Sequence, residues 1–279
     1  GLEREGEDVP LSVTSQLPAP SEGAPVQTTL PPEIARIQAR KTLIVGVVGV
    51  PNAPFFAQTK HGPDGLDVVL ARAIAKELGV GLEITTAART FDAVIGEVQA
   101  HRVDIGIAKL SRTVSRAERV AFTSDYVHLR QAMLVNRVLY AKVGPKGNFA
   151  EYVRNFSGDL AVIAGSSYAT YAKRRFPAAH ILEYPSWQAV LDAVSSGRAL
   201  AAYRDELEIK KVLRDHPDAS LRFRAVVFSD TRDPLAMAVP WDSQSLRLWL
   251  DEFLELRNVD FPVDDILNAF TPEGSMVKT

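Results

Sequence analysis

Polar side chains gather in one short stretch of the sequence, directly after a predicted strand. Residues 103–108 alternate apolar with small or polar positions, which is typical of a strand that is covered on one face. Four residues that could bind an anion follow it: Lys109, Ser111, Thr113 and Arg116. Ligands of open α/β sheets bind beyond the carboxyl ends of strands, and hydroxyls with a forked guanidinium suit a carboxylate. The stretch therefore predicts a receptor for a small carboxylate.

The spacing of Ser115 and Glu118 predicts that a short helix begins within this stretch. A serine three positions before a glutamate is the pattern of a capping box. Arg116 would then lie in the first helical turn, where its guanidinium adds to the partial positive charge of free backbone amides. An arginine in that position is also commonly a solvated surface residue. Both interpretations, ligand contact and surface residue, stay open on this spacing alone.

Three more polar residues follow predicted buried strands in the second part of the chain. Ser166 and Ser167 stand at a sharp turn after the apolar run 159–164. Asp205 comes directly after another buried strand. A carboxylate there could bind an ammonium group, because a desolvated ion pair needs its partner close. All three residues also fit a second interpretation, in which they cap the helices that follow them.

The composition is that of an ordinary water-soluble globular chain. The 279 residues are 46% hydrophobic and 24% charged, with a net charge of −2, so nothing points to nucleic acid or to an anionic membrane surface. Cysteine is absent, which excludes disulfides, thiol catalysis and cysteine-based metal sites. Residues 1–32 are rich in proline and weakly periodic, which predicts an extended linker or tail. We find no apolar run that is long enough for a membrane span, and no apolar core of a signal peptide in residues 1–23.

The remaining sequence alternates predicted strands and helices. An apolar run at 42–50 reads as a strand that is buried on both faces. The spacing predicts a helix at 68–78 that is capped by Asp67, and a helix that is capped by Thr90. Alternation of this kind indicates an α/β fold.

Two separated runs resemble the signature of periplasmic amino-acid-binding proteins of ABC transporters, solute-binding protein family 3. They are AKLSRTVSR at 108–116 and AFTSDY at 121–126, and they follow the pattern G-x-[ST]-x-T-x-x-R, then F-[ST]-x-x-Y. The resemblance implies that Arg116 pairs with the α-carboxylate of a ligand. It assigns hydroxyl positions of the same site to Ser111 and Thr113. Lys109 departs from the pattern, and if it points inward, an acidic amino acid or a dicarboxylate becomes the expected ligand.

Other runs extend the resemblance over residues 33–258. The run LAVIAGSS at 160–167 resembles a family motif whose hydroxyls hold the carboxylate from the opposite side, which implies ligand contact by Ser166 and Ser167. RALAAYRDE at 198–206 resembles the motif whose aspartate binds the α-ammonium, which implies that role for Asp205. The family often offers an aromatic residue at the positions of Phe55 and Phe91, and a core position fits either ring as well.

The resemblance implies a two-lobed α/β fold of the type II periplasmic-binding-protein kind, with two crossing strands as the hinge. Lobe 1 would comprise residues 33–133 plus 236–279, and lobe 2 residues 137–232. The expected function is extracytoplasmic capture of a small amino acid or carboxylate between the lobes and its delivery to an ABC permease. We expect a monomer that is periplasmic or otherwise extracytoplasmic, with the N-terminal tail as a candidate tether to the membrane.

Two alternatives remain open on the sequence. The same fold serves as the ligand-sensing extracytoplasmic domain of receptors, and some relatives are dehydratases or carry a transglycosylase domain. Residue patterns for phosphate binding, zinc binding and a serine nucleophile are absent, and the five histidines are scattered. The sequence therefore predicts no catalytic residue, no metal and no cofactor.

Overall fold

The computed structural model describes residues 29–272 and 276–277, and those from Pro31 onward belong to one compact unit. The predicted tail, residues 1–32, lies outside the described residues except for its last four. Within the described ranges, no helix is long and apolar enough to cross a membrane.

One mixed sheet organises the unit, in the order β4-β1-β5-β10-β6-β9-β7-β8. β1 pairs in parallel with β4 and β5, and β7 pairs in parallel with β8 and β9. The strands of this sheet are β1 (Thr42–Gly46), β4 (Gly81–Thr85), β5 (Ile105–Gly106), β6 (Ala121–Asn136), β7 (Asp159–Ile163), β8 (His180–Tyr184), β9 (Ala201–Asp205) and β10 (Phe223–Val239). A separate hairpin joins β2 (Ala57–Thr59) and β3 (Gly62–Asp64).

Helices connect these strands and cover both faces of the sheet. In the first part of the chain they are α1 (Pro32–Arg40), α2 (Leu66–Leu78), α3 (Phe91–Gln99) and α4 (Val114–Ala117). In the second part they are α5 (Arg137–Val143), α6 (Phe149–Arg154), α7 (Ser167–Arg175), α8 (Trp187–Ser195), α9 (Glu206–Asp215) and α10 (Ala219–Arg222). The chain ends with α11 (Gln244–Leu256) and α12 (Val263–Ala269).

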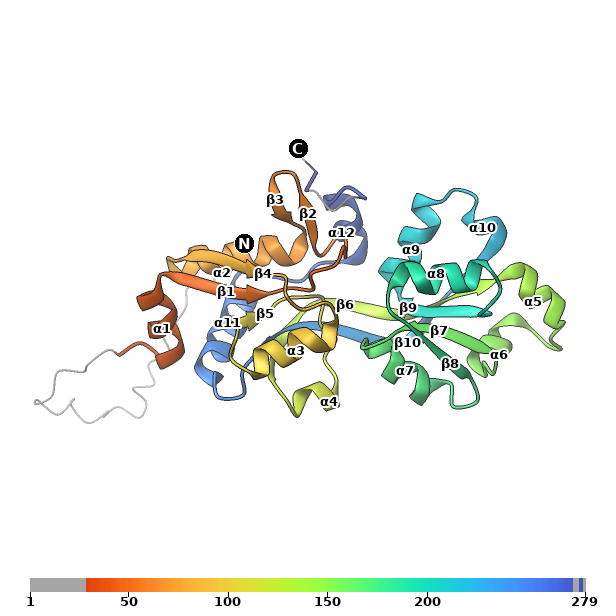
Figure 1. The fold of residues 1–279 in the computed structure, drawn as a ribbon, viewed down its shortest axis with the longest axis horizontal. Helices are drawn as coiled ribbons and strands as arrows, with labels where there is room; N and C mark the ends of the chain where they lie inside the picture. The colour runs from red at the N-terminus through yellow and green to blue at the C-terminus, as the bar shows by residue number, and fades with distance from the viewer. Residues whose placement is uncertain (1–28, 273–275, 278–279) are drawn as a thin grey trace, which may run out of the picture. The chain divides into compact units, whose positions relative to one another are not determined.

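The long strands β6 and β10 run through both parts of the sheet (Figure 1). They pair antiparallel from Phe223↔Asn136 to Val239↔Ala121, with a register shift between Phe228 and Asp233. We call the elements α1 to α4, β1 to β5, α11 and α12 the first half, and the elements α5 to α10 and β7 to β9 the second half. The sequence predicts the two crossing strands at 127–136 and 234–240; they correspond to β6 and β10, both of which begin earlier. The lobe boundaries that were set at 133, 137, 232 and 236 stay a prediction.

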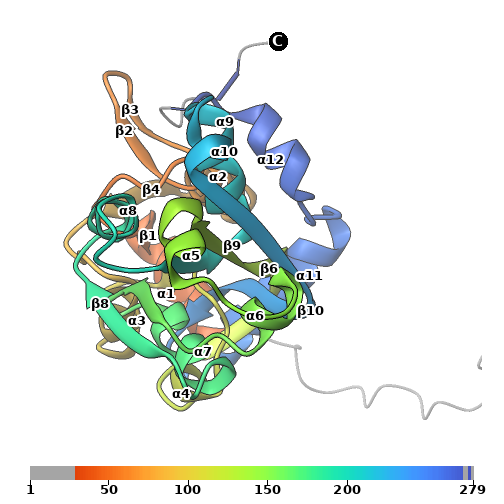
Figure 2. The ribbon, with the colours of Figure 1, turned by 90° about the vertical axis from the view of Figure 1, so that its right-hand side faces the viewer.

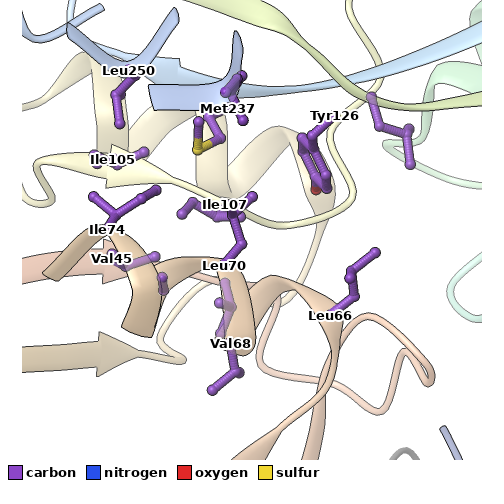
Figure 3. Close-up of a cluster of buried hydrophobic side chains, with 14 of the residues drawn as sticks. Val45, Leu66, Val68, Leu70, Ile74, Ile105, Ile107, Tyr126, Met237 and Leu250 are labelled. Carbon is purple, nitrogen blue, oxygen red and sulfur yellow. The ribbon is translucent and has the colours of Figure 1, made fainter. Parts of the chain in front are cut away.

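The first half is built on apolar side chains that meet between the sheet and helices α2 and α11. Figure 3 shows Val45 of β1, Ile74 of α2, Ile105 of β5 and Leu250 of α11 pointing toward one another. All four are completely buried. On the other face of the sheet, α3 packs through a second cluster that includes Val94, so helices cover both sides.

In the second half, successive residues of one strand pack into two different hydrophobic clusters, one on each face of the sheet. Leu160 and Val162 of β7 belong to a cluster with α7, whereas Ala161 between them belongs to a cluster with α8 and α9. Successive strand residues point to opposite faces, so this alternation puts helices on both sides. Figure 2 shows α7 on one side of these strands and α8 and α9 on the other. The turn before α7 and the end of β9 are thereby fixed on a rigid frame.

Candidate ligand-binding site

Seven of the nine predicted site residues line one pocket, together with three residues that the sequence did not single out. The pocket is lined by Phe91, Lys109, Ser111, Arg116, Ser166, Ser167, Tyr168, Arg204, Asp205 and Asp233. The side chains come from both halves and from β10, and they leave a cavity of only about 10 Å³. That is about the space that one water molecule needs. A larger ligand therefore requires the two halves to separate at this point.

Arg116 is buried at one wall of the pocket, with 5% of its surface exposed. Its Nη1 donates to the Ser111 carbonyl oxygen at 3.0 Å, and its Nε lies 3.1 Å from Asp92 Oδ1. The Asp92 side chain is 50% exposed, so this ion pair is weak. The other terminal nitrogen, Nη2, has no recorded hydrogen bond within the part of the chain that the structure describes. Arg116 therefore keeps donors for a ligand.

The predicted capping box at Ser115 and Glu118 is wrong. Helix α4 spans only Val114–Ala117, and its N-cap is Thr113, whose hydroxyl accepts from the Arg116 backbone N–H at 3.1 Å. Glu118 follows the helix as its C-cap. Thr113, two positions earlier, is the N-cap in place of Ser115, so the helix begins before Ser115. Thr113 thus orients Arg116 and does not line the pocket.

Ser111 joins the two halves through its hydroxyl. It accepts a hydrogen bond from Ser167 Oγ at 2.8 Å and donates to Asp233 Oδ1. The other oxygen of Asp233 accepts from the Tyr168 hydroxyl at 2.8 Å. Burial raises the pKa of Asp233 above its usual value, and the nearby Asp205 carboxylate adds to the rise. These hydroxyls form one buried network that reaches both halves.

Lys109 points inward and is the centre of a buried ion network. Its Nζ lies 2.6 Å from Asp205 Oδ2 and 3.3 Å from Glu208 Oε1, and only 3% of its side chain is exposed. Burial alone would raise the pKa of Glu208, but the cations of Lys109, Arg204 and Lys211 together outweigh it and lower that pKa to about 2. Lys109 therefore points inward, as the expectation of an acidic amino acid or dicarboxylate required, but its charge is already paired with Asp205 and Glu208, and the ligand stays a prediction.

Asp67 holds the loop that carries Lys109. Its Oδ2 accepts from the Lys109 backbone N–H at 2.9 Å, and its Oδ1 accepts from the Tyr126 hydroxyl at 2.6 Å. The N-cap of α2 is Gly65, so the predicted capping role of Asp67 is wrong. Lys109 has a φ of +51°, a conformation that L residues rarely adopt, and the Asp67 hydrogen bond stabilises it. Thr90 does cap its helix, with the hydroxyl accepting from Ala93 N.

The remaining predicted residues have mixed placements. Ser166 is the N-cap residue of α7, but its hydroxyl donates to the Ile163 carbonyl at 2.6 Å and makes no cap hydrogen bond. Asp205 does cap α9, accepting from Glu208 N at 3.0 Å, while it pairs with Lys109. Phe91 lines the pocket. Phe55 is fully buried in the core of the first half, with its ring centroid 5.1 Å from Lys109 Nζ.

Sequence reasoning missed Arg204 and Asp233, although both left a signal. Arg204 is a charged residue in strand β9, directly after Ala201, Ala202 and Tyr203, and its guanidinium carbon lies 5.0 Å from the ring centroid of Trp187. Asp233 directly precedes the apolar run 234–240. The register shift places it at the site, and the Thr231 hydroxyl stabilises the shift by accepting from Gln131 N and donating to the Phe228 carbonyl. A charged residue inside or beside a buried strand needs an ionic or hydrogen-bond partner, which the apolar residues of the strand do not supply.

The arrangement suits binding of a charged organic molecule. Three cationic side chains and two carboxylates line the pocket, and none of the five histidines does. The described residues hold no group of three or more histidines, aspartates or glutamates that could bind a metal ion. The three cations and two carboxylates of the lining suit ionic recognition of a ligand.

The family model for bacterial extracellular solute-binding proteins, family 3, matches residues 43–270 of this chain. The chain belongs to this family. The matched range contains every predicted site residue and, apart from α1 and the first residue of β1, all elements of both halves, which agrees with the resemblance in the sequence. Its structural relatives are two-lobed amino-acid-binding proteins, so the predicted fold class is confirmed.

Known solute-binding proteins match most of this chain. A probable amino-acid ABC transporter-binding protein of Haemophilus influenzae is 27% identical over 68% of this chain and 70% of its own length. A solved binding component of an ABC transporter from Wolinella succinogenes, complexed with lysine, is 25% identical, covers 82% of this chain and 95% of the other, and has a TM-score of 0.68.

The same domain also occurs within larger proteins. A membrane-bound lytic murein transglycosylase F of Aliivibrio fischeri is 27% identical over 77% of this chain, but the match spans only 43% of that enzyme. The relatives therefore include binding proteins and enzymes.

Proposed function

We propose that this solute-binding protein captures a small amino acid or carboxylate in the pocket between its halves and delivers it to an ABC permease. It acts outside the cytoplasm as a monomer, without catalysis of its own, and its N-terminal segment tethers it to the membrane. The observation that carries the proposal is the buried Arg116 guanidinium, which faces hydroxyls of both halves in a chain of this family.

Arg116, Ser111 and Ser167 would hold the ligand's carboxylate. Hydrogen bonds to charged groups contribute about 1.5–3 kcal/mol each, so three of them approach the roughly 8 kcal/mol of a micromolar complex. The ligand touches both halves only when they close, so it shifts the population toward the closed form. Thr113 supports the site through its cap on the backbone of Arg116, and Phe55 through its contact with Lys109.

A thermal-shift screen tests whether the chain binds such ligands. The probes are the amino acids and small mono- and dicarboxylates, each at millimolar concentration. A ligand at about one hundred times its dissociation constant stabilises the fold by about 2.7 kcal/mol, which corresponds to roughly 5–10 °C for a chain of this size. If no amino acid and no carboxylate raises the melting temperature, the proposed function is wrong.

Replacing Arg116 by alanine tests the position of the site. Without the Arg116 guanidinium, the buried carboxylate of the ligand has no ionic partner. We therefore expect the affinity for the ligand found in the screen to fall by about 3 kcal/mol or more, which is over one hundredfold. Titration calorimetry measures it. Arg112→Ala is the matched control, because the Arg112 side chain is 44% exposed and pairs with Asp125 away from the pocket lining. Equal affinities of the two variants would contradict the assignment.

A second candidate function is a ligand-sensing domain within a larger receptor or enzyme. The match to less than half of the transglycosylase favours it, because there the domain is one part of a longer chain. A gene that encodes this domain together with a further domain supports the second candidate, and neighbouring permease genes support the first.

A further inference from the structure

The Lys109 ammonium group lies against Asp205, in the position that a ligand's ammonium group would occupy. The Asp205 carboxylate is 1% exposed, and its Oδ2 lies 2.6 Å from Lys109 Nζ. Its Oδ1 accepts from the Glu208 backbone N–H at 3.0 Å. Both oxygens of Asp205 thus already have a donor from the chain itself, and one of those donors is an ammonium group.

The other carboxylate of the lining offers no better partner for an ammonium. Asp233 is 1% exposed and accepts hydrogen bonds from Ser111 and Tyr168, one on each oxygen. Its raised pKa also favours the neutral acid relative to an ordinary aspartate. Within the pocket lining, every carboxylate oxygen is therefore engaged by a side chain or a backbone amide of the protein.

The cations of the lining are less fully engaged. Arg204 is 5% exposed and approaches only at ion-pair distance, with Nε 3.7 Å from Asp205 Oδ2 and Nη2 4.0 Å from Glu208 Oε1. No hydrogen bond of its guanidinium is recorded among the described residues. Together with Arg116, it brings N–H donors to the lining of a pocket whose carboxylate oxygens already accept hydrogen bonds. An anionic ligand would accept charge-assisted hydrogen bonds from these two guanidinium groups.

We propose that Lys109 sets the ligand class of this site: the protein takes a small carboxylate that carries no α-ammonium group, because Lys109 already fills the ammonium position on Asp205. This inference rests on the proposed function and narrows it. The carboxylate binds to Arg116 and its hydroxyl partners, and Arg204 is available for a second polar or acidic group.

The test compares α-amino acids with the same molecules without the α-amino group. Three pairs are titrated by calorimetry into the wild-type protein: L-glutamate and glutarate, L-leucine and 4-methylpentanoate, L-lysine and 6-aminohexanoate. For each pair that binds, we expect the amino acid to bind no more tightly than its partner, because its ammonium is desolvated beside Lys109 and Arg204. An amino acid that binds more tightly than its desamino partner overturns the inference and leaves the proposed function intact.

Two variants test whether Lys109 causes this preference. Lys109→Gly suits the positive φ of the position and frees Asp205, so we expect the amino acids to gain about tenfold or more relative to their partners. Lys109→Arg keeps a cation against Asp205 and should keep the wild-type preference. A gain with both variants, or with neither, overturns the role of Lys109. If the glycine variant does not fold, the wild-type titrations still decide the ligand class.

Failure of the inference and failure of the proposed function give different results. If the wild-type protein binds no member of any pair and shows no thermal shift with the wider panel, the proposed function is wrong and the inference fails with it. If it binds amino acids preferentially, only the inference fails.

Discussion

Replacing Asp205 by alanine is expected to lower the free energy of unfolding by about 3–5 kcal/mol, because it removes one partner of a buried ion pair. Lys109 is 3% exposed in its side chain, and its closest carboxylate is Asp205 at 2.6 Å. The variant leaves Lys109 with Glu208 alone, at 3.3 Å, and also removes the side-chain cap of α9. Urea unfolding followed by circular dichroism measures the loss.

Two further variants separate the causes. Asp205→Asn removes the charge but keeps an oxygen that can cap the helix. We expect it to lower the free energy of unfolding by most of the amount that Asp205→Ala does. Asp230→Ala breaks an exposed ion pair with Arg175, since the Asp230 side chain is 72% exposed, and should cost less than about 1 kcal/mol. A loss below about 1 kcal/mol for Asp205→Ala would show that water reaches Lys109, which would contradict the buried network.

Replacing Asp67 by asparagine is expected to raise the free energy of unfolding relative to the wild type, by an amount that grows as the pH rises. Burial raises the pKa of Asp67 from 3.8 to about 7, against the lowering effect of its hydrogen bonds with Tyr126 and Lys109. The folded protein therefore binds this proton more tightly than the unfolded chain, and wild-type stability falls as the pH rises from about 4 to about 7. Asparagine resembles the neutral acid and has no such dependence.

At about 1.4 kcal/mol per pKa unit, the rise to about 7 corresponds to roughly 4 kcal/mol in favour of the asparagine variant above pH 7. Urea unfolding of both proteins at intervals from about pH 4 to about pH 8 measures the difference in free energy, in which titrations common to both cancel. Asp265→Asn is the control, because Asp265 is exposed in the first turn of α12. A difference that stays constant with pH would mean that Asp67 is ionised throughout this range.

The sequence predicted the fold class and the residues of the pocket wall because both depend on local patterns. A continuous apolar run marks β7, and the family signature marks Arg116 and Ser111. Strand β7, Asp159–Ile163, is one residue shorter than the predicted strand 159–164. Such patterns can be recognised in the sequence because they involve residues that are near neighbours in the chain.

Pairings between distant residues could not be predicted in the same way. Asp67 reads as a helix cap by its position, but its partners, Lys109 and Tyr126, lie 42 and 59 residues away. Asp233 reaches the pocket only because of a register shift in β10. The direction of Lys109 depends on a positive φ, which its residue type does not signal. These features decide the chemistry of the site, and each depends on tertiary contacts.

A crystal structure of the protein with the best ligand from the thermal-shift screen tests the central claim most directly. We predict that the ligand's carboxylate lies within hydrogen-bond distance of the Arg116 guanidinium and of the Ser111 or Ser167 hydroxyl, between the two halves. A ligand bound elsewhere, with Arg116 still bonded only to Asp92 and the Ser111 carbonyl, would contradict the account.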